Sequence, residues 1–214
     1  MVQHTLAAFA QVPRIESCLV VVAPDDRFFS GALPAGVEVA TCGGDSRAAS
    51  VLNGLGQLAA AGAEADDWVL VHDAARCLIT AALVDQLINA CHCDPVGGLL
   101  AHPVPDTLKQ GQEGRVLATV GREDKWLAQT PQMFRLGALT QALQMAVTLG
   151  ETVTDEASAM EAAGLSPQLV RGSAHNFKVT WPEDFVLAEA LIQSRISAAQ
   201  PQKVSLDESR HESV

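Results

Sequence analysis

Short apolar runs alternate with amphipathic segments along most of the chain. Runs that are apolar at every position are typical of strands buried on both faces, and apolar residues spaced three and four apart are typical of helices. The predicted strands cover 17–23, 37–41, 69–73, 97–104, 169–170 and 177–179. The predicted helices cover 46–61, 81–90 and 136–149, one that opens at 154, and 182–199. This order predicts an α/β fold with a mainly parallel sheet and helices on both faces.

One segment interrupts this alternation. Two short strand-like pieces, 106–109 and 116–120, flank a polar stretch and predict a hairpin. We expect residues 105–126 to project as an arm that contacts a partner subunit or covers a site, with a simple surface excursion as the alternative. The chain length predicts a single domain over 1–199, and the polar, aperiodic end at 200–214 predicts a disordered tail.

Composition narrows the class of protein. Hydrophobic residues make up 48% and charged residues 18% of the 214 residues, as in globular proteins, and no apolar run has the length of a membrane span. The N-terminal residues lack a secretory pattern, which predicts a cytoplasmic location. Five scattered cysteines argue against a disulfide framework. The segment Cys91-His92-Cys93 lacks a second ligand pair at zinc-like spacing, so we expect no zinc site.

Net charge argues against one class of partner. Lys and Arg total 14 against 25 Asp and Glu, giving a formal charge of -11. This charge would repel a nucleic-acid backbone, and the sequence shows no basic stripe to offset it. A small phosphorylated substrate remains compatible, because a few inward cations and a divalent metal ion can create a local positive site.

The segment VLVHDAAR, residues 69–76, carries the first candidate for chemistry. Three apolar residues end in His72 and Asp73, so a carboxylate stands at the carboxyl end of a predicted strand, where α/β sheets place their ligands. Arg76 adds a positive charge able to pair with Asp73 or with phosphate oxygens. The alternative is that Asp73 caps the next segment and pairs with Arg76 on the surface.

Seven segments together resemble one family. They are GGDSRAASV (43–51), VLVHDAAR (69–76), PDTLK (105–109), TVGREDKW (119–126), QTPQMF (129–134), TVTDEASAME (152–161) and NFKVTWPEDF (176–185). In order and spacing, they resemble the 2-C-methyl-D-erythritol 4-phosphate cytidylyltransferases. The resemblance implies a Rossmann-like nucleotide-diphospho-sugar transferase fold. It also implies cytidylyl transfer from CTP to 2-C-methyl-D-erythritol 4-phosphate in non-mevalonate isoprenoid synthesis, with release of pyrophosphate.

The same resemblance implies roles for individual residues. The positions matching the nucleotide pocket are Gly44, Arg47, Ser50, Asp73 and Ala74. Those matching the acceptor site are Thr154, Arg76 and Thr130, and those implied to be catalytic are Asp73, Arg122 and Lys178. Arg122 would come from the arm of a partner subunit in a homodimer, and Mg²⁺ would accompany CTP. Taken singly, Lys178 also fits a solvated strand residue and Arg122 a surface charge.

The resemblance is incomplete at the start of the chain. The family opens with a strand and a basic glycine-rich loop around the CTP triphosphate, whereas MVQHTLAAFAQ matches the helix that follows. An upstream start, a fragment and a degenerate paralogue each explain this. Without that strand, we expect an empty central position in the sheet, beside 17–23 or its neighbour. The alternative function is a non-catalytic dimer that binds a phosphorylated ligand or a protein. A nicotinamide-binding dehydrogenase is disfavoured, because no G-x-G-x-x-G motif follows a strand.

Overall fold

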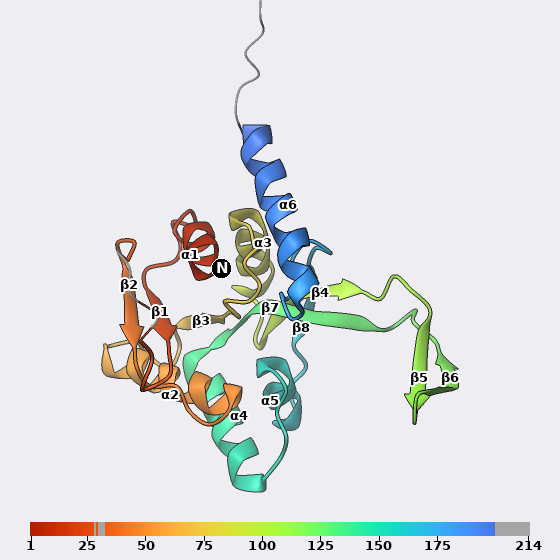
Figure 1. Cartoon of the computed structure of the whole chain (residues 1–214). Helices are drawn as coiled ribbons and strands as arrows, with labels where there is room; N and C mark the ends of the chain where they lie inside the picture. Colours follow the sequence, from red (N-terminus) through yellow and green to blue (C-terminus); the bar gives the residue numbers. More distant parts are fainter. Residues whose placement is uncertain (28, 30–32, 200–214) are drawn as a thin grey trace, which may run out of the picture. The chain divides into compact units, whose positions relative to one another are not determined.

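The computed structural model describes residues 1–27, 29 and 33–199, and it has the α/β architecture that the sequence predicts (Figure 1). The elements are α1 (Val2–Phe9), β1 (Cys18–Val21), β2 (Val37–Ala40), α2 (Arg47–Ala60), β3 (Trp68–Val71), α3 (Ala81–Cys91), β4 (Gly97–Pro103), β5 (Leu108–Gln112), β6 (Arg115–Val120), β7 (Trp126–Arg135), α4 (Leu136–Leu149), α5 (Glu156–Ala162), β8 (Gln168–Arg171) and α6 (Pro182–Ala199). No helix among these residues is both long and apolar enough to cross a membrane.

The chain divides into two compact units, residues 1–178 and 179–214. The single domain predicted over 1–199 stays a prediction. The described part of the second unit is mainly α6, which leaves the large apolar side chains of Phe185, Val186 and Leu187 exposed. The predicted tail, 200–214, lies outside the described residues and stays a prediction.

The central sheet has the strand order β3-β7-β4-β8. β7 pairs antiparallel with β3 and with β4, and β4 pairs parallel with β8. Three of the four strands therefore run in one direction, as predicted, and β7 is the exception. β7 runs back along β4 because the chain leaves the sheet at the end of β4, forms the arm and returns, which is the connection of a long hairpin.

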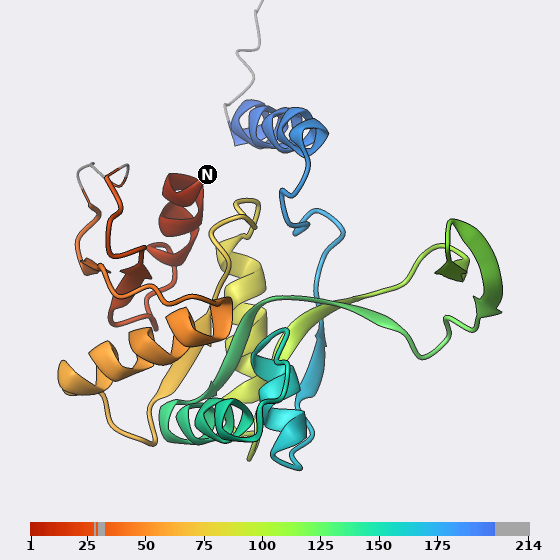
Figure 2. The same cartoon turned by 60° about the horizontal axis from the view of Figure 1, so that its bottom comes forward.

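Two apolar clusters cover opposite faces of this sheet. On one face, α1 and α3 pack against the sheet through residues that include Phe9, Leu87 and Leu100. On the other face, α2, α4 and α5 pack against residues that include Val69 and Phe134. Figures 1 and 2 show α2, α4 and α5 on the same side of the sheet. The predicted helices on both faces are thus confirmed.

β1 and β2 form a separate parallel pair, and no hydrogen-bonded ladder joins β1 to β3 among the described strands. A cavity of about 310 Å³ lies between them, lined mainly by apolar residues of α1, β1, α2 and β3. On the other side of β1, the backbone pairs with β2, because Cys18 and Val22 donate their N–H groups to the β2 side. By strand alternation the backbone groups of Leu19 and Val21 face away from β2. This opening agrees with the empty position expected beside residues 17–23.

The arm consists of β5 and β6, which pair antiparallel and project beyond the central sheet (Figure 2). The predicted hairpin is thereby confirmed, although its turn is shorter than the polar stretch 110–114. Glu113 and Gly114 occupy the turn, both with positive φ, a conformation that glycine adopts at no steric cost. The strands can therefore extend to Gln112 and Arg115.

Two helices begin close to their predicted bounds, each behind a side-chain cap. Ser46 caps α2 and Thr80 caps α3, each through a side-chain oxygen that accepts a backbone N–H. Two expectations need correction. The helix expected to open at 154 begins at Glu156 with Asp155 as its cap, because the Asp155 carboxylate accepts the N–H of Ser158. Residues 177–179 form no strand, since they join no ladder among the described residues.

Candidate active site

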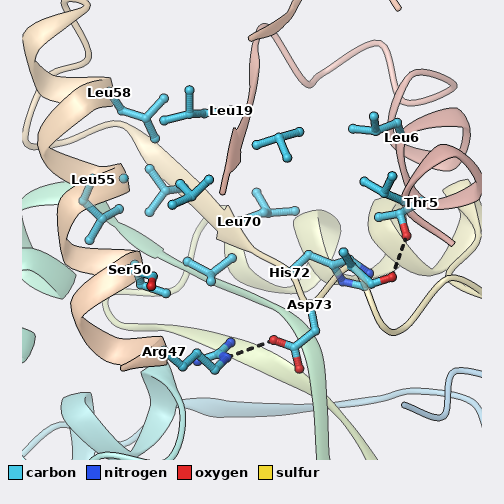
Figure 3. Close-up of a pocket in the computed structure, with 18 residues that line it drawn as sticks. Thr5, Leu6, Leu19, Arg47, Ser50, Leu55, Leu58, Leu70, His72 and Asp73 are labelled. Carbon is cyan, nitrogen blue, oxygen red and sulfur yellow. Dashed lines mark hydrogen bonds and ion pairs between the residues drawn. The ribbon is translucent and has the colours of Figure 1, made fainter. Parts of the chain in front are cut away.

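Asp73 lies two residues after the end of β3 and between two cations. Its Oδ1 accepts a hydrogen bond from Nε of Arg47 at 2.9 Å, and its Oδ2 lies 3.1 Å from Nζ of Lys178 (Figure 3 shows the pair with Arg47). The three residues are separated by up to 131 positions in sequence. Arg47 is the first residue of α2, and Lys178 is the last residue of the first unit. The fold therefore assembles a cluster at the strand end where the sequence places a carboxylate.

The charges around Asp73 keep it ionised. Burial opposes ionisation, but Arg47 and then Lys178 outweigh it through charge and hydrogen bonding, so the pKa of Asp73 lies below its usual value. Asp73 retains a side-chain exposure of 15%. The site thus offers a fixed negative charge flanked by positive charges at the rim of the cavity between β1 and β3.

A hydrogen-bonded chain fixes the backbone at this point. The N–H of Asp73 donates to Oγ1 of Thr130 at 3.0 Å, and Oγ1 lies 3.0 Å from Nδ1 of His72. Nε2 of His72 lies 3.3 Å from the carbonyl oxygen of Arg76. Because that carbonyl accepts, the partners assign the proton to Nε2 and make Nδ1 the acceptor of the Thr130 hydroxyl. Thr130 thus supports the site beneath Asp73.

His72 should make the protein less stable in acid. Burial is the main cause that lowers its pKa from 6.5 to about 4. Between those pH values the unfolded chain therefore binds a proton at residue 72 that the folded chain does not bind. The contribution of neutral His72 to the free energy of unfolding is complete above pH 6.5 and falls as the pH drops to about 4. We expect a loss of roughly 2–3 kcal/mol across this window, measured by urea unfolding at several pH values.

The substitution His72→Gln should flatten this pH dependence. His4→Gln is the matched control, because His4 is an exposed residue of α1 and should leave the slope as it is in the wild type. An unfolding free energy of His72→Gln that still falls by the wild-type amount between pH 6.5 and 4 would contradict this role.

Most residues predicted to form the nucleotide pocket lie together. Arg47, Ser50, Asp73 and Ala74 all line the cavity between β1 and β3. Gly44 lies next to this set, because its N–H donates to Oγ of Ser50 at 3.0 Å. The cap at Ser46 explains the grouping, since it starts α2 so that residues 47 and 50 face the end of β3 (Figure 3).

Arg76 does not pair with Asp73 as one interpretation of the sequence had it. Its Nη1 donates to the carbonyl oxygen of Asn176 at 2.9 Å, and its Nη2 donates to that of Ala128 at 3.1 Å. Asn176 is itself fully buried and donates to the carbonyl oxygen of Thr130. These bonds hold the segment that leads into Lys178 against β7.

Two predicted site residues lie outside the cluster. Arg122 is exposed in the loop between β6 and β7, and its guanidinium bonds to the carbonyl oxygen of Pro105 within the same arm. Thr154 is exposed just before α5, where its N–H donates to Oγ of Ser158 at 3.1 Å. Within the described part of this chain, neither residue is bonded to Asp73.

Glu156 belongs to the site but was not among the predicted site residues. Its carboxylate is 1% exposed and accepts two hydrogen bonds from Arg47, from Nη1 at 2.6 Å and from Nη2 at 3.0 Å. Burial raises the pKa of Glu156, and the pairing with Arg47 opposes that rise. The sequence signal was an acid in the first turn of a helix, which is commonly explained by the helix dipole alone.

Metal-ligating residues do not cluster in the described ranges. No group of three or more His, Cys, Asp or Glu side chains could hold a metal ion there, and this includes Cys91, His92 and Cys93. Both carboxylates of the site, Asp73 and Glu156, already have their oxygens bonded to cations.

Comparisons with known proteins agree with this geometry. The family model "IspD: 2-C-methyl-D-erythritol 4-phosphate cytidylyltransferase" matches residues 1–194. A bifunctional enzyme IspD/IspF of Albidiferax ferrireducens is 64% identical over 210 residues, which cover 97% of this chain but 50% of that protein. A 2-C-methyl-D-erythritol 4-phosphate cytidylyltransferase of Paraburkholderia phytofirmans is 53% identical over 205 residues, with 93% and 86% covered. The chain thus spans about half the length of the first of these relatives.

Solved structures give the same result. The crystal structure of a 4-diphosphocytidyl-2C-methyl-D-erythritol synthase is similar with a TM-score of 0.80 and 39% identity, covering 89% of each chain. The 2-C-methyl-D-erythritol 4-phosphate cytidylyltransferase from Thermus thermophilus has a TM-score of 0.76 and 34% identity, covering 89% of this chain and 87% of its own. Together with the family match over residues 1–194, these likenesses show that the chain belongs to the 2-C-methyl-D-erythritol 4-phosphate cytidylyltransferase (IspD) family.

Proposed function

We propose that the protein transfers a cytidylyl group from CTP to 2-C-methyl-D-erythritol 4-phosphate. In this reaction a phosphate oxygen of the acceptor attacks the α-phosphorus of CTP, and the bond from that phosphorus to the bridging oxygen of the β-phosphate breaks. The products are 4-diphosphocytidyl-2-C-methyl-D-erythritol and pyrophosphate. No covalent intermediate with the protein is needed, so the protein must position two anions and offset their charge.

One observation carries this proposal: the carboxylate of Asp73 holds both Arg47 and Lys178 at the end of β3. An acceptor phosphate and a triphosphate repel each other, and fixed cations reduce that repulsion where charge builds up in the transition state. The position at the end of a strand is also where α/β sheets bind nucleotides. Asp73 keeps the cations at this point instead of acting as a nucleophile.

The remaining site residues take supporting roles in the proposal. Lys178 would bind the acceptor phosphate, and Thr154 would add a hydroxyl beside the start of α5. Arg76 would help to bind the acceptor indirectly, by holding the segment before Lys178 in place. Its hydrogen bonds to two backbone carbonyl oxygens support this role. Gly44 and Ser50 would form the side of the pocket that takes the nucleotide. Their hydrogen bond to each other supports a fixed loop at that side.

Mg²⁺ is proposed as a companion of CTP and not as an ion held by the protein alone. The described carboxylates form no cluster suited to it, and those of Asp73 and Glu156 are occupied by cations. In phosphoryl transfer Mg²⁺ is usually held largely by substrate phosphates and water. Its chemistry there is to offset the charge of the triphosphate.

We also propose a homodimer formed through the arm, with Arg122 of each arm serving the site of the other subunit. The support is a set of apolar side chains on and next to the arm that are exposed in one chain, namely Val116, Leu117, Trp126 and Leu127. Large apolar side chains exposed on a projecting element favour an interface there. A cytoplasmic location is proposed as well, supported by five cysteines that are all free.

The substitution Leu117→Lys should weaken the dimer at least tenfold, because it places a charge in the proposed interface. Sedimentation of the purified chain over a range of concentrations measures this. Leu149→Lys is the matched control, since Leu149 is about as exposed, at 63% against 59%, but lies at the end of α4. Equal dissociation constants for both variants, or a wild-type chain that stays monomeric, would contradict the proposal.

The reaction is tested by pyrophosphate release from CTP, Mg²⁺ and 2-C-methyl-D-erythritol 4-phosphate. Formation of the cytidylyl product with release of pyrophosphate in equal amount supports the proposal. Binding of both ligands, seen by calorimetry, without any turnover would overturn the catalytic assignment in favour of a protein that binds phosphorylated ligands.

A further inference from the structure

Glu156 occupies an unusual position for a carboxylate. It is 1% exposed, and its two oxygens accept hydrogen bonds from the two terminal nitrogens of Arg47 at 2.6 and 3.0 Å. The third nitrogen of the same guanidinium, Nε, donates to Asp73 at 2.9 Å. Arg47 thus bridges two carboxylates, one buried and one at the rim of the cavity. Because a guanidinium is planar, fixing two of its nitrogens also fixes the direction of the third.

The position of Glu156 is itself set by the central sheet. Gln132 of β7 is 1% exposed, and its Nε2 donates to Oδ2 of Asp155 at 2.8 Å. Its Oε1 accepts the N–H of Ala157 at 2.7 Å. One buried amide therefore holds the residues before and after Glu156. This series of contacts runs from β7 through the start of α5 to Arg47 and ends at Asp73.

We propose that Glu156 is a positioning residue for the transfer reaction, acting through Arg47 to fix the carboxylate of Asp73. This inference rests on the proposed function. With a side chain only 1% exposed, Glu156 would not itself touch the substrates. Its role is to prevent the guanidinium of Arg47, whose side chain is one-third exposed, from turning away to bind an incoming phosphate. Asp73 then keeps one oxygen for Arg47 and the other for Lys178.

A double-mutant cycle separates this role from general stabilisation. Glu156→Gln should lower kcat by about 10–100-fold, because small errors of placement near the reacting atoms cost that much. If Glu156 acts through Arg47, the same change made in an Arg47→Gln background should lower kcat by less than about threefold more, since coupled residues are non-additive. A full further loss in that background would overturn the proposal.

Two control variants distinguish a specific effect of Glu156 from a general effect of substitution in this region. Glu161→Gln changes an exposed glutamate of the same helix, α5, and should keep the wild-type kcat. Arg47→Lys keeps the charge but removes the fork, so it should reproduce the loss seen in Glu156→Gln. If Glu156→Gln fails to fold, Arg47→Lys measured against Glu161→Gln still decides: a wild-type kcat for Arg47→Lys would overturn the proposal.

An NMR measurement tests the proposal without depending on turnover. In the wild type, the Nε–H of Arg47 should give an NMR signal that exchanges slowly with solvent, identified by its loss in Arg47→Lys. Glu156→Gln should speed this exchange at least tenfold, whereas Glu161→Gln should not. Faster exchange with no turnover in any variant would place the failure in the proposed function, whereas unchanged exchange would overturn the role of Glu156.

Discussion

Asp73→Asn is expected to lower kcat on the order of 10²–10³-fold, the range seen when one preorganised electrostatic group is removed from an active site. The physical reason is specific to this geometry. One oxygen of Asp73 faces Nε of Arg47 and the other faces Nζ of Lys178. An asparagine amide has one oxygen and one NH₂ group, so in either orientation an NH₂ group must face a cation. At least one cation then leaves its position.

Steady-state pyrophosphate release measures this effect, with KM values for both substrates determined separately. Asp66→Asn is the matched control, because Asp66 lies in the exposed turn before the same strand, β3. We expect that control to keep the wild-type kcat. A kcat for Asp73→Asn within threefold of the wild type would show that the strand-end carboxylate has no part in the reaction.

The sequence predicted the parts of the site that depend on local pattern. Val69–Val71 followed by Asp73 indicates a strand and its carboxyl end from neighbouring residues alone. The cap at Ser46 likewise fixes the start of α2 locally. Local pattern could not show which distant partners meet at these points, and only the family resemblance placed Arg47 and Lys178 at the site of Asp73. Arg76 is three residues from Asp73, yet it bonds to backbone carbonyls, whereas Arg47 and Lys178 come from far along the chain.

The strand β7 and the role of Glu156 were hidden for a similar reason. No strand was predicted over Trp126–Arg135, because polar residues and a proline interrupt its apolar positions. β7 runs opposite to its neighbours because the arm brings the chain straight back along β4. An acid after an N-cap is favoured by the helix dipole whether or not it is buried. Only the packing of α5 against α4 and the sheet places Glu156 out of solvent, where it needs a partner.

The second large expected effect is on stability, because the buried carboxylate of Glu156 needs a cationic partner. Arg47→Met is expected to lower the free energy of unfolding by about 3–5 kcal/mol at neutral pH, because it leaves a buried carboxylate without its cation. The matched control is Arg14→Met. Arg14 pairs with Asp85, but both side chains are about 40% exposed, so its loss should cost less than about 1 kcal/mol.

The pH dependence identifies the cause. Burial raises the pKa of Glu156, and Arg47→Met removes the charge that opposes this rise. A folded-state pKa above the unfolded value means that the penalty grows as the pH rises from the unfolded value through the folded one, and disappears in more acid solution. The deficit of Arg47→Met relative to the wild type should therefore shrink between pH 7 and about 4.5 in urea unfolding, while that of Arg14→Met stays small throughout. A deficit that is constant over this range would assign the loss to packing of the Arg47 side chain and not to the buried charge of Glu156.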